Sequence, residues 1–402
     1  MEGCSEKPIL SNWRYGENVM MPLGPVGIIS TQVQPALADE VNRKLRHLRQ
    51  AYVEEYPELR DNTGYLRKDY TIDVDLSRFN TGEGQATLLE TVRGHDLFIL
   101  TDVMNYGSYT NRFGRFVSLS PDEHYQDLVR LITATHGLAR RVNVIMPYLY
   151  EGRRYRRLNR ASMDCAIMLR MLFKLGISNF ITFDAHDGRV ANAVPRSNFE
   201  SFPTALPIIE QLLEKIPDLV LDKEHFMIIS PKETGISRAI YFATLMHVPL
   251  GTFYRIFQAD GSSSKKGFLG DNVEGRDVLI VDDMIDTGQT VLESAAYLKE
   301  HGARRVFAAV SFGLFTQGYE PFNQAYDFGV IDKVFATNLI YQDRPLQSMP
   351  WFQSIDMSQN LANVIDTMNH NASLSQLLGQ EERIDALVEK HNHKLREEKS
   401  KE

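Results

Sequence analysis

One run of thirteen residues, VLIVDDMIDTGQT at 278–290, restricts the folds open to this chain more than any other segment. Its first four residues form an apolar run typical of a strand that is buried on both faces of a parallel sheet. Two carboxylates, Asp282 and Asp283, follow, and a turn containing Gly288 leads into a pattern that predicts a helix from about Thr290. Strand, turn and helix in this order predict a doubly wound α/β fold.

The same run carries groups that suit a sugar phosphate. Adjacent carboxylates at a strand end accept hydrogen bonds from neighbouring hydroxyls, as on a ribose, or hold a divalent cation. Gly288 lets the backbone approach a ligand closely, and the N-terminus of the following helix favours a phosphate. Thr287 and Thr290 add hydroxyl donors. The alternative is a structural turn with Thr290 as the N-cap, but the whole block is more specific than a lone DTG.

Apolar runs alternate with helical patterns through most of the 402 residues. The predicted strands are at 26–29, 96–100, 142–148, 179–186, 225–231, 278–283 and 305–315. Strands separated by helices of this length imply parallel sheets with right-handed crossovers. We therefore expect binding residues just past the carboxyl ends of strands.

Chain length and the repeated pattern predict two similar doubly wound parallel-sheet domains. We expect an extension at 1–25, a first domain at 26–195, a second domain at 196–345 and a C-terminal segment at 346–402. Polar stretches at 50–75 and 103–124 are expected to be insertions or long loops. The tail from Gln380 predicts a charged amphipathic helix, for which the plain interpretation is a solvated terminal helix.

Composition narrows the class of partner. A net charge of −8 argues against a general nucleic-acid binder. The two cysteines, Cys4 and Cys165, imply no disulfide framework and fit a reducing compartment. No stretch approaches the ~20 apolar residues that span a bilayer. We therefore expect a cytoplasmic protein without nucleic-acid or membrane partners.

The run at 278–290 resembles the phosphoribosyl-pyrophosphate motif shared by type I phosphoribosyltransferases and ribose-phosphate pyrophosphokinases. Further segments resemble the pyrophosphokinases: FNTGE at 79–83, VNVIMPYLYEGRRYRR from Val142, NFITFDAH from Asn179 and IISPKETGISRA from Ile228. The resemblance extends from about Val26 to about Leu378. Because phosphoribosyltransferases usually lack the first half, the chain is identified as a member of the pyrophosphokinase family.

This resemblance implies transfer of diphosphate from ATP to ribose 5-phosphate, giving phosphoribosyl pyrophosphate and AMP for nucleotide biosynthesis, with Mg²⁺ as cofactor. It implies that Asp282 and Asp283 contact the ribose hydroxyls. The residues that would hold the 5-phosphate are Asp286, Thr287, Gly288, Gln289 and Thr290. It also implies a homo-oligomer in which two subunits share each ATP site.

For ATP, the resemblance implies adenine contacts from Phe79 and Glu83, phosphate contacts from Arg153 and Arg154, and His186 as a metal ligand at the Mg·ATP site. Taken alone, Phe79 would be a core residue and His186 a structural or solvent residue. The arginine cluster that begins at Arg153 would be a solvated face or a site for an acidic partner. Arginine forks at a strand end nevertheless suit phosphate oxygens.

The family's mobile catalytic loop normally carries a lysine and two arginines, and here the matching residues are Arg255, Ile256 and Phe257. We expect Arg255 to replace the lysine as a cation. Lys265 and Lys266, in the Gly- and Ser-rich loop GSSSKKG, are expected to supply the remaining charge. The alternative for that segment is a disordered surface loop.

Four positions depart from the family pattern. Tyr155 and Thr81 stand where acids are usual, Phe257 replaces an arginine, and Lys232 replaces an acid that helps to hold a metal. An ammonium cannot ligate Mg²⁺ but can neutralise phosphate charge. Three interpretations stay open: a divergent active enzyme, a non-catalytic regulatory homologue that partners an active subunit, and a phosphoribosyltransferase. An assay for AMP separates the first two.

Overall fold

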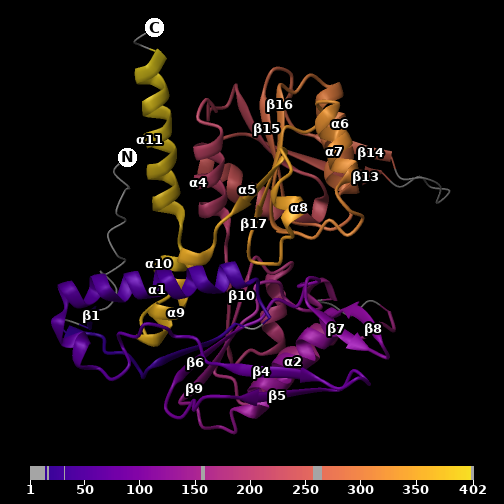
Figure 1. The fold of residues 1–402 in the computed structure, drawn as a ribbon. Helices are drawn as coiled ribbons and strands as arrows, with labels where there is room; N and C mark the ends of the chain where they lie inside the picture. Colours follow the sequence, from indigo (N-terminus) through magenta and orange to yellow (C-terminus); the bar gives the residue numbers. More distant parts are fainter. Residues whose placement is uncertain (1–13, 16–17, 31, 155–158, 257–264, 400–402) are drawn as a thin grey trace. The chain divides into compact units, whose positions relative to one another are not determined.

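The computed structural model describes residues 14–15, 18–30, 32–154, 159–256 and 265–399. The chain divides into two compact units (Figure 1). Unit 1 comprises residues 1–202, 339–341 and 357–378, and unit 2 comprises residues 203–338, 342–356 and 379–402. The C-terminal segment predicted at 346–402 is thus divided between the two units.

Unit 1 is built on a five-stranded parallel sheet in the order β11-β10-β9-β6-β3. The strands are β3 (Val26–Ile29), β6 (Asp96–Leu100), β9 (Arg141–Ile145), β10 (Asn179–Phe183) and β11 (Asn198–Phe202). Its longer helices are α1 (Pro35–Glu55), α2 (Pro121–Ala134), α3 (Asp164–Lys174) and α9 (Ser358–Asn369). β6 and β10 are buried along their whole length, which explains why apolar residues occupy most of their positions.

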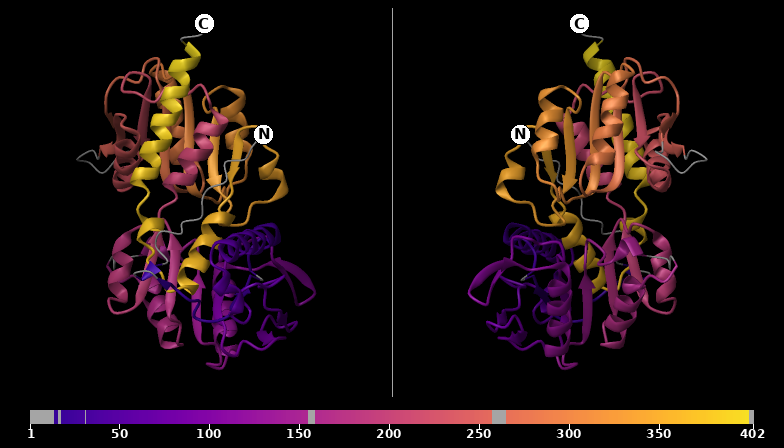
Figure 2. Two further views of the ribbon diagram at one scale, coloured as in Figure 1. Left: turned by 90° about the vertical axis from the view of Figure 1, so that its left-hand side faces the viewer. Right: turned by 90° about the vertical axis from the view of Figure 1, so that its right-hand side faces the viewer.

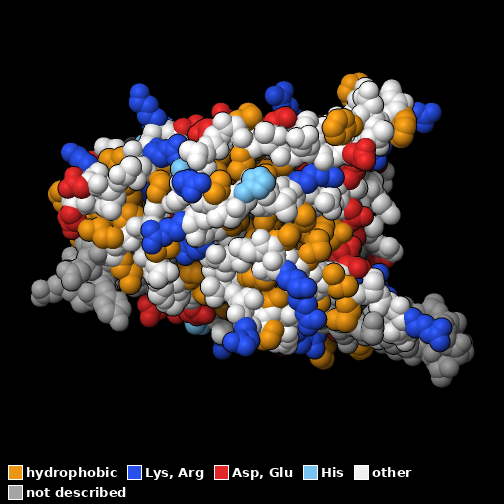
Figure 3. All heavy atoms as spheres, turned by 90° about the horizontal axis from the view of Figure 1, so that it is seen from below, with side chains coloured by type: hydrophobic (Ala, Val, Ile, Leu, Met, Phe, Trp, Pro, Cys, Tyr) orange, Lys and Arg blue, Asp and Glu red, His pale blue; other side chains and the backbone are white. Residues whose placement is uncertain are grey.

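The two polar stretches of unit 1 contain regular structure. The first holds the end of α1 and the 3-10 helix η2 (Pro57–Asp61). The second holds a hairpin of β7 (Tyr109–Arg112) and β8 (Arg115–Ser118). Another hairpin is formed by β4 (Val74–Arg78) and β5 (Gly84–Leu88). Large side chains at the β7–β8 hairpin are exposed. In Figure 3, which shows one face of the molecule, apolar side chains lie between acidic and basic ones.

A buried ion pair joins the returning C-terminal segment to the N-terminal helix of unit 1. Arg49 in α1 and Asp366 in α9 have no exposed side-chain area, and Nε of Arg49 lies 2.7 Å from Oδ1 of Asp366. The guanidinium also donates to Asn369 Oδ1 at 2.6 Å and to the carbonyl of Tyr65 at 3.2 Å. A buried charge needs such partners, so this contact fixes where α9 packs.

Unit 2 is built on a seven-stranded sheet in the order β14-β13-β12-β15-β16-β17-β18. The strands are β12 (Phe226–Ser230), β13 (Leu250–Ile256), β14 (Lys265–Leu269), β15 (Asp277–Ile285), β16 (Arg305–Gly313), β17 (Lys333–Thr337) and β18 (Phe352–Ile355). Its helices include α4 (Ala205–Lys215), α5 (Ile236–Met246), α6 (Gln289–Glu300), α7 (Glu320–Asp327), α8 (Arg344–Gln347) and α11 (Glu381–Lys399). Every pair of neighbouring strands is parallel except β13 with β14. Figures 1 and 2 show α6 and α7 on one face of this sheet and α4, α5 and α11 on the other.

The charged C-terminal helix α11 docks on unit 2. Ile384 and Val388 are 0% and 3% exposed, and the helix packs against α4 and α5. Its polar side chains also bind backbone: Nε2 of His391 donates to the carbonyl of Leu219 at 2.8 Å. The interpretation of α11 as a solvated terminal helix is therefore wrong, because one apolar stripe in a charged sequence is enough to bury a face. No helix in the described part of the chain is long and apolar enough to cross a membrane.

The ion pair of unit 1 can be tested against an exposed pair in the same helix. Arg49→Ala leaves the carboxylate of Asp366 buried without its charge partner, which should cost about 3–5 kcal/mol of unfolding free energy. Arg43→Ala removes the exposed contact with Glu40 and should cost less than about 1 kcal/mol. Denaturant unfolding of both full-length variants measures the difference. Equal losses would show that Arg49 does not fix the packing of α9.

Candidate functional site

Strand β15 runs past the end of β12, and the two carboxylates lie on this overhang. The pairing of β12 with β15 ends at Ile229 opposite Ile280, whereas β15 pairs with β16 as far as Ile285 opposite Gly313. Asp282 and Asp283 therefore lie inside β15, which ends at Ile285, two residues beyond the predicted end of the strand at 283. Pairing with β16 continues the strand, while the turn after β12 borders the acids on the other side.

Lys232, in the turn after β12, supplies a positive charge to this acid pair. Its Nζ is 2.9 Å from Oδ2 of Asp282 and 3.6 Å from Oδ1 of Asp283. Burial, together with the neighbouring Asp283, raises the pKa of Asp282 to about 7, and Lys232 opposes that rise. Burial acts to lower the pKa of Lys232, but the two carboxylates outweigh it and raise that pKa. The turn therefore holds an ammonium against the acids.

The turn after β15 is fixed from the next strand. Thr316 follows β16, and its hydroxyl donates to Oδ1 of Asp286 at 2.7 Å. The backbone N–H of Thr316 donates to the carbonyl of Asp286 at 2.9 Å. Sequence reasoning missed Thr316, although β16 was predicted and neighbouring parallel strands end at the same edge of a sheet.

Gly288 is the N-cap of α6, with φ +85°. A Cβ on this residue would lie 2.3 Å from Cε2 of Phe322, so glycine is required by packing as well as by backbone conformation. The alternative with Thr290 as the N-cap is wrong, since α6 begins at Gln289. The first turn of α6 holds no acidic residue, which leaves its positive dipole end suited to an anion.

The side chains of Thr287 and Gln289 shape this turn. Oγ1 of Thr287 accepts a hydrogen bond from the backbone N–H of Gln289 at 3.4 Å. The amide of Gln289 donates to Oε1 of Glu293 at 2.8 Å, so that side chain is directed along α6. The acid pair and the helix N-terminus are thus joined by one short turn, which is the arrangement that a sugar phosphate would require.

The residues expected to be catalytic cations belong to the paired strands β13 and β14. Arg255 is exposed near the end of β13, and its backbone N–H donates to Oε1 of Glu233 at 2.6 Å. Glu233 is the residue after Lys232, so the turn that supplies this positive charge also contacts the strand that carries Arg255. Lys265 and Lys266 belong to β14, where Lys266 pairs in register with Arg255, and not to a loop. Phe257 lies outside the described residues.

In unit 1 the residues that the sequence predicts to contact ATP phosphates and Mg²⁺ follow two neighbouring strands. β9 and β10 are adjacent and parallel, so the segments after them leave the sheet at the same edge. Arg153 and Arg154 lie in the 3-10 helix η3 (Gly152–Arg154), and Nε of Arg153 donates to the hydroxyl of Tyr148 at 3.2 Å. His186 follows β10 and is half-buried. Tyr155 lies outside the described residues.

Phe79 and Glu83 bound the turn of the β4–β5 hairpin. Phe79 is 59% exposed, so the interpretation as a core residue is wrong. Thr81 donates to Oε2 of Glu83 at 3.0 Å, and the N–H of Phe113 donates to the carbonyl of Asn80 at 3.0 Å. The β7–β8 hairpin, which belongs to one of the polar stretches, therefore supports this turn.

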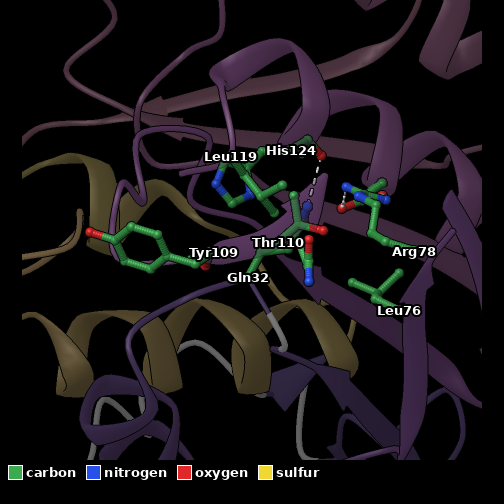
Figure 4. Close-up of a pocket in the computed structure, with 10 residues that line it drawn as sticks. Gln32, Leu76, Arg78, Tyr109, Thr110, Leu119 and His124 are labelled. Atoms are coloured by element: carbon green, nitrogen blue, oxygen red, sulfur yellow. Dashed lines mark hydrogen bonds and ion pairs between the residues drawn. The ribbon is translucent and has the colours of Figure 1, made fainter. Parts of the chain in front are cut away.

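A cavity of about 370 Å³ lies beside the same hairpin (Figure 4). Arg78, the residue before Phe79, lines it and donates to both carboxylate oxygens of Asp127 in α2, at 2.6 and 2.5 Å. Gln32 closes another side and donates to the carbonyl of His124 at 2.7 Å. These contacts anchor β4 on α2 and so hold the base of the turn that carries Phe79.

No group of three or more histidine, cysteine or acidic side chains that could hold a metal occurs among the described residues. The ammonium of Lys232 contacts the acid pair and cannot ligate a metal. His186 could supply one nitrogen ligand to a metal whose other ligands would be phosphate oxygens. Substrate phosphate oxygens are usual ligands of Mg²⁺ at nucleotide sites.

The packing of Gly288 can be separated from its backbone conformation with a second glycine of unit 2. Gly275 has a similar φ, +74°, but a Cβ there would meet no atom within 4 Å. We expect Gly288→Ala to cost about 1–3 kcal/mol more than Gly275→Ala, because only the former crowds a packed ring. Thermal unfolding compares the two variants, and Phe322→Leu should recover part of the loss in Gly288→Ala. Equal losses in the two single variants would mean that contact with Phe322 is unimportant.

Two family models match the chain. The N-terminal domain of ribose phosphate pyrophosphokinase matches residues 26–176. The phosphoribosyl synthetase-associated domain matches residues 265–379. The ribose-phosphate pyrophosphokinase of Mycoplasma pneumoniae is 27% identical over 305 residues, 75% of this chain and 86% of that protein. The enzyme of the same name from Vibrio parahaemolyticus is 29% identical over 311 residues, 75% of this chain and 90% of that protein.

A solved structure, the phosphoribosylpyrophosphate synthetase of Mycobacterium smegmatis, matches with a TM-score of 0.68 and 19% identity, covering 86% of this chain and 99% of that one. This likeness confirms the predicted fold of two parallel-sheet domains of the type I phosphoribosyltransferase kind. The matched models lie in both halves of the sequence, and the relatives cover three quarters of it. The chain belongs to the ribose-phosphate pyrophosphokinase family.

Proposed function

We propose that this protein is a ribose-phosphate diphosphokinase. It would transfer the β,γ-diphosphoryl group of ATP to the 1-hydroxyl of ribose 5-phosphate and release phosphoribosyl pyrophosphate and AMP. The observation that carries the proposal is the buried acid pair of β15, joined through Asp286–Thr290 to the N-terminus of α6. The relatives that share both halves of the chain bear the name of this activity.

The geometry of unit 2 suits the sugar phosphate in two parts. Carboxylate oxygens of Asp282 and Asp283 would accept hydrogen bonds from the ribose hydroxyls. The N–H groups that open α6, with the hydroxyls of Thr287 and Thr290, would hold the 5-phosphate. Fixing the sugar at both ends leaves the 1-hydroxyl as the group presented for reaction, and such positioning is the main work in phosphoryl transfer.

ATP would bind through unit 1. Arg153 and Arg154 would hold the phosphates by bidentate contacts, and Phe79 and Glu83 would contact adenine, supplied to a neighbouring subunit of a homo-oligomer. His186 would contribute a ligand to Mg²⁺ on the polyphosphate. Mg²⁺ bound there neutralises charge on the diphosphoryl group. We place this reaction in the cytoplasm, because a chain with two cysteines and no disulfide framework fits a reducing compartment.

Transfer needs positive charge on the diphosphoryl group as it leaves ATP. Arg255 would supply it, with Lys265 and Lys266 of the adjoining strand. A guanidinium keeps its proton, so Arg255 would act by charge and hydrogen bonding and not as a base. The contact between its backbone and Glu233 would keep this end of β13 beside the acid-pair turn.

A regulatory homologue is the second candidate, and the observation that favours it is Lys232 in place of an acid. An assay of the purified protein with ATP, ribose 5-phosphate and Mg²⁺, in which AMP is measured, decides between the two. AMP formation supports the enzyme. Ribose 5-phosphate binding without AMP under any divalent cation supports the regulatory homologue. A phosphoribosyltransferase is disfavoured, because the chain carries the N-terminal pyrophosphokinase domain.

Ribose 5-phosphate binding should depend on Asp283. Asp283→Ala removes an acceptor for a buried hydroxyl and should weaken binding by about 1–3 kcal/mol. Calorimetry with the full chain measures this. The matched control is Asp327→Ala, an exposed acid of α7 in the same unit, which should leave affinity unchanged. Unchanged affinity in Asp283→Ala would remove this residue from the site.

Turnover should depend on Arg255 more than binding does. Removing one preorganised contact to developing charge typically lowers the rate by ~10²–10³-fold, so Arg255→Ala should lower kcat by this order. Its affinity for ribose 5-phosphate should stay near that of the unmodified protein, because the guanidinium would act on the transferring group. Steady-state kinetics and calorimetry on the same preparation separate the two effects. A parallel fall in both quantities would instead indicate a defect in the sugar site.

A further inference from the structure

The acid pair of β15 already has a cation supplied by the chain. The side chains of Asp282 and Asp283 are 4% and 6% exposed, and the ammonium of Lys232 contacts both. Two ionised carboxylates that are desolvated side by side repel each other, so their burial requires a counter-charge. Lys232 is 31% exposed, so the ammonium lies between the buried acids and the solvent from which a metal would enter.

The turn that carries Lys232 is built to hold it there. Its carbonyl accepts hydrogen bonds from the hydroxyl of Ser230 at 2.8 Å and from the N–H of Gly235 at 3.1 Å. Gly235 packs closely: a Cβ there would lie 3.2 Å from Oγ of Ser230 and 3.5 Å from Oδ1 of Asp282. Glu233 is the one acid of this turn, and its Oε1 accepts a hydrogen bond from the backbone N–H of Arg255 at 2.6 Å. The backbone beside the acids is therefore fixed.

An ammonium and a divalent cation compete for the same carboxylate lone pairs. With Nζ at 2.9 Å from Oδ2 of Asp282, a metal at this oxygen would have to displace Lys232. The displaced charge would then remain next to the metal, which disfavours its binding. The residues present at this point of unit 2 thus do not fit the metal that the family pattern implies.

We propose that Lys232 replaces a divalent cation at the acid pair, so that the site for the sugar's vicinal hydroxyls is assembled without a metal bound there. The proposal rests on the proposed function only in that it names a sugar phosphate as the ligand. Only the acid pair would lack a metal, and a metal on the polyphosphate would be unaffected. Lys232 is accordingly a positioning residue, which holds the carboxylates in place to accept hydrogen bonds.

The first experiment measures Mn²⁺ binding to the full-length protein without substrates, by electron paramagnetic resonance. In Lys232→Asp a shorter acidic side chain vacates the space of the ammonium and adds a third carboxylate. We expect this variant to bind Mn²⁺ roughly tenfold more tightly than the unmodified protein, or better, because oxygen ligand number and charge set such affinities. Lys390→Asp makes the same change of charge at an exposed position of α11 and controls for general attraction of cations.

A gain in Lys232→Asp that exceeds the gain in Lys390→Asp, and that is lost on adding Asp283→Asn, supports the proposal. Equal gains in a folded Lys232→Asp protein overturn it. If Lys232→Asp does not fold, the unmodified protein still tests the proposal. Mn²⁺ binding to the unmodified protein would overturn the proposal if Asp283→Asn abolishes that binding.

The second experiment uses the unmodified protein and ribose 5-phosphate. Its affinity, measured by calorimetry, should be the same in excess EDTA as in Mg²⁺, because the counter-ion is part of the chain. A marked loss of affinity in EDTA overturns the proposal. Absence of ribose 5-phosphate binding in both buffers contradicts the proposed function instead, and the Mn²⁺ comparison then decides the role of Lys232 by itself.

Discussion

Two adjacent carboxylates buried in an overhanging strand are the constraint on which the rest of unit 2 depends. β15 can carry Asp282 and Asp283 inside its length only because β16 pairs beyond them while β12 has already ended. On the side of β15 where β12 has ended, the buried acids need a counter-charge, because neither solvent nor another strand supplies one there. The turn after β12 meets this need with Lys232, and its position follows from the register of the two strands.

The same constraint bears on phosphate binding. A phosphate group at the N-terminus of α6 would have the same sign as the ionised acid pair, which lies only one short turn away. The ammonium of Lys232 reduces the local negative charge, and the N-terminus of α6 presents its positive dipole end with no acid in the first turn. Gly288 makes this possible, because only a residue without Cβ fits between the turn and the ring of Phe322. Within a few residues the chain thus holds acids that need a positive counter-charge and a helix N-terminus that suits an anion.

Sequence reasoning predicted the parts of this structure that local pattern decides. The apolar runs at 26–29, 96–100 and 278–281 lie in buried strands, and the spacing between them predicted parallel pairing. The strand, the glycine turn and the helix of 278–290 were also predicted, because their residues stand together in sequence.

What could not be predicted depends on contacts between distant segments. The end of β15 is set by β16, and the strand identity of Lys265 and Lys266 is set by pairing with β13. Packing of α11 depends on Ile384 and Val388 meeting α4 and α5, which a charge count cannot reveal. The partner of Asp286 required the order of strands in the sheet, since Thr316 is 30 residues away.

Lys232 and Arg255 are best understood together, because Glu233 links them. The carboxylate of Glu233 accepts a hydrogen bond from the backbone N–H of Arg255. The ammonium of the preceding residue, Lys232, contacts the acid pair. Against the family pattern, one position has exchanged an acid for a cation, and the other has exchanged one cation for another. Neither change removes positive charge from the neighbourhood of the acid pair. A decayed site would be expected to lose the charge balance that buried acids need, whereas here the balance is kept by a residue that the chain itself positions. The two altered residues therefore fit the proposal of an acid pair held by a fixed cation.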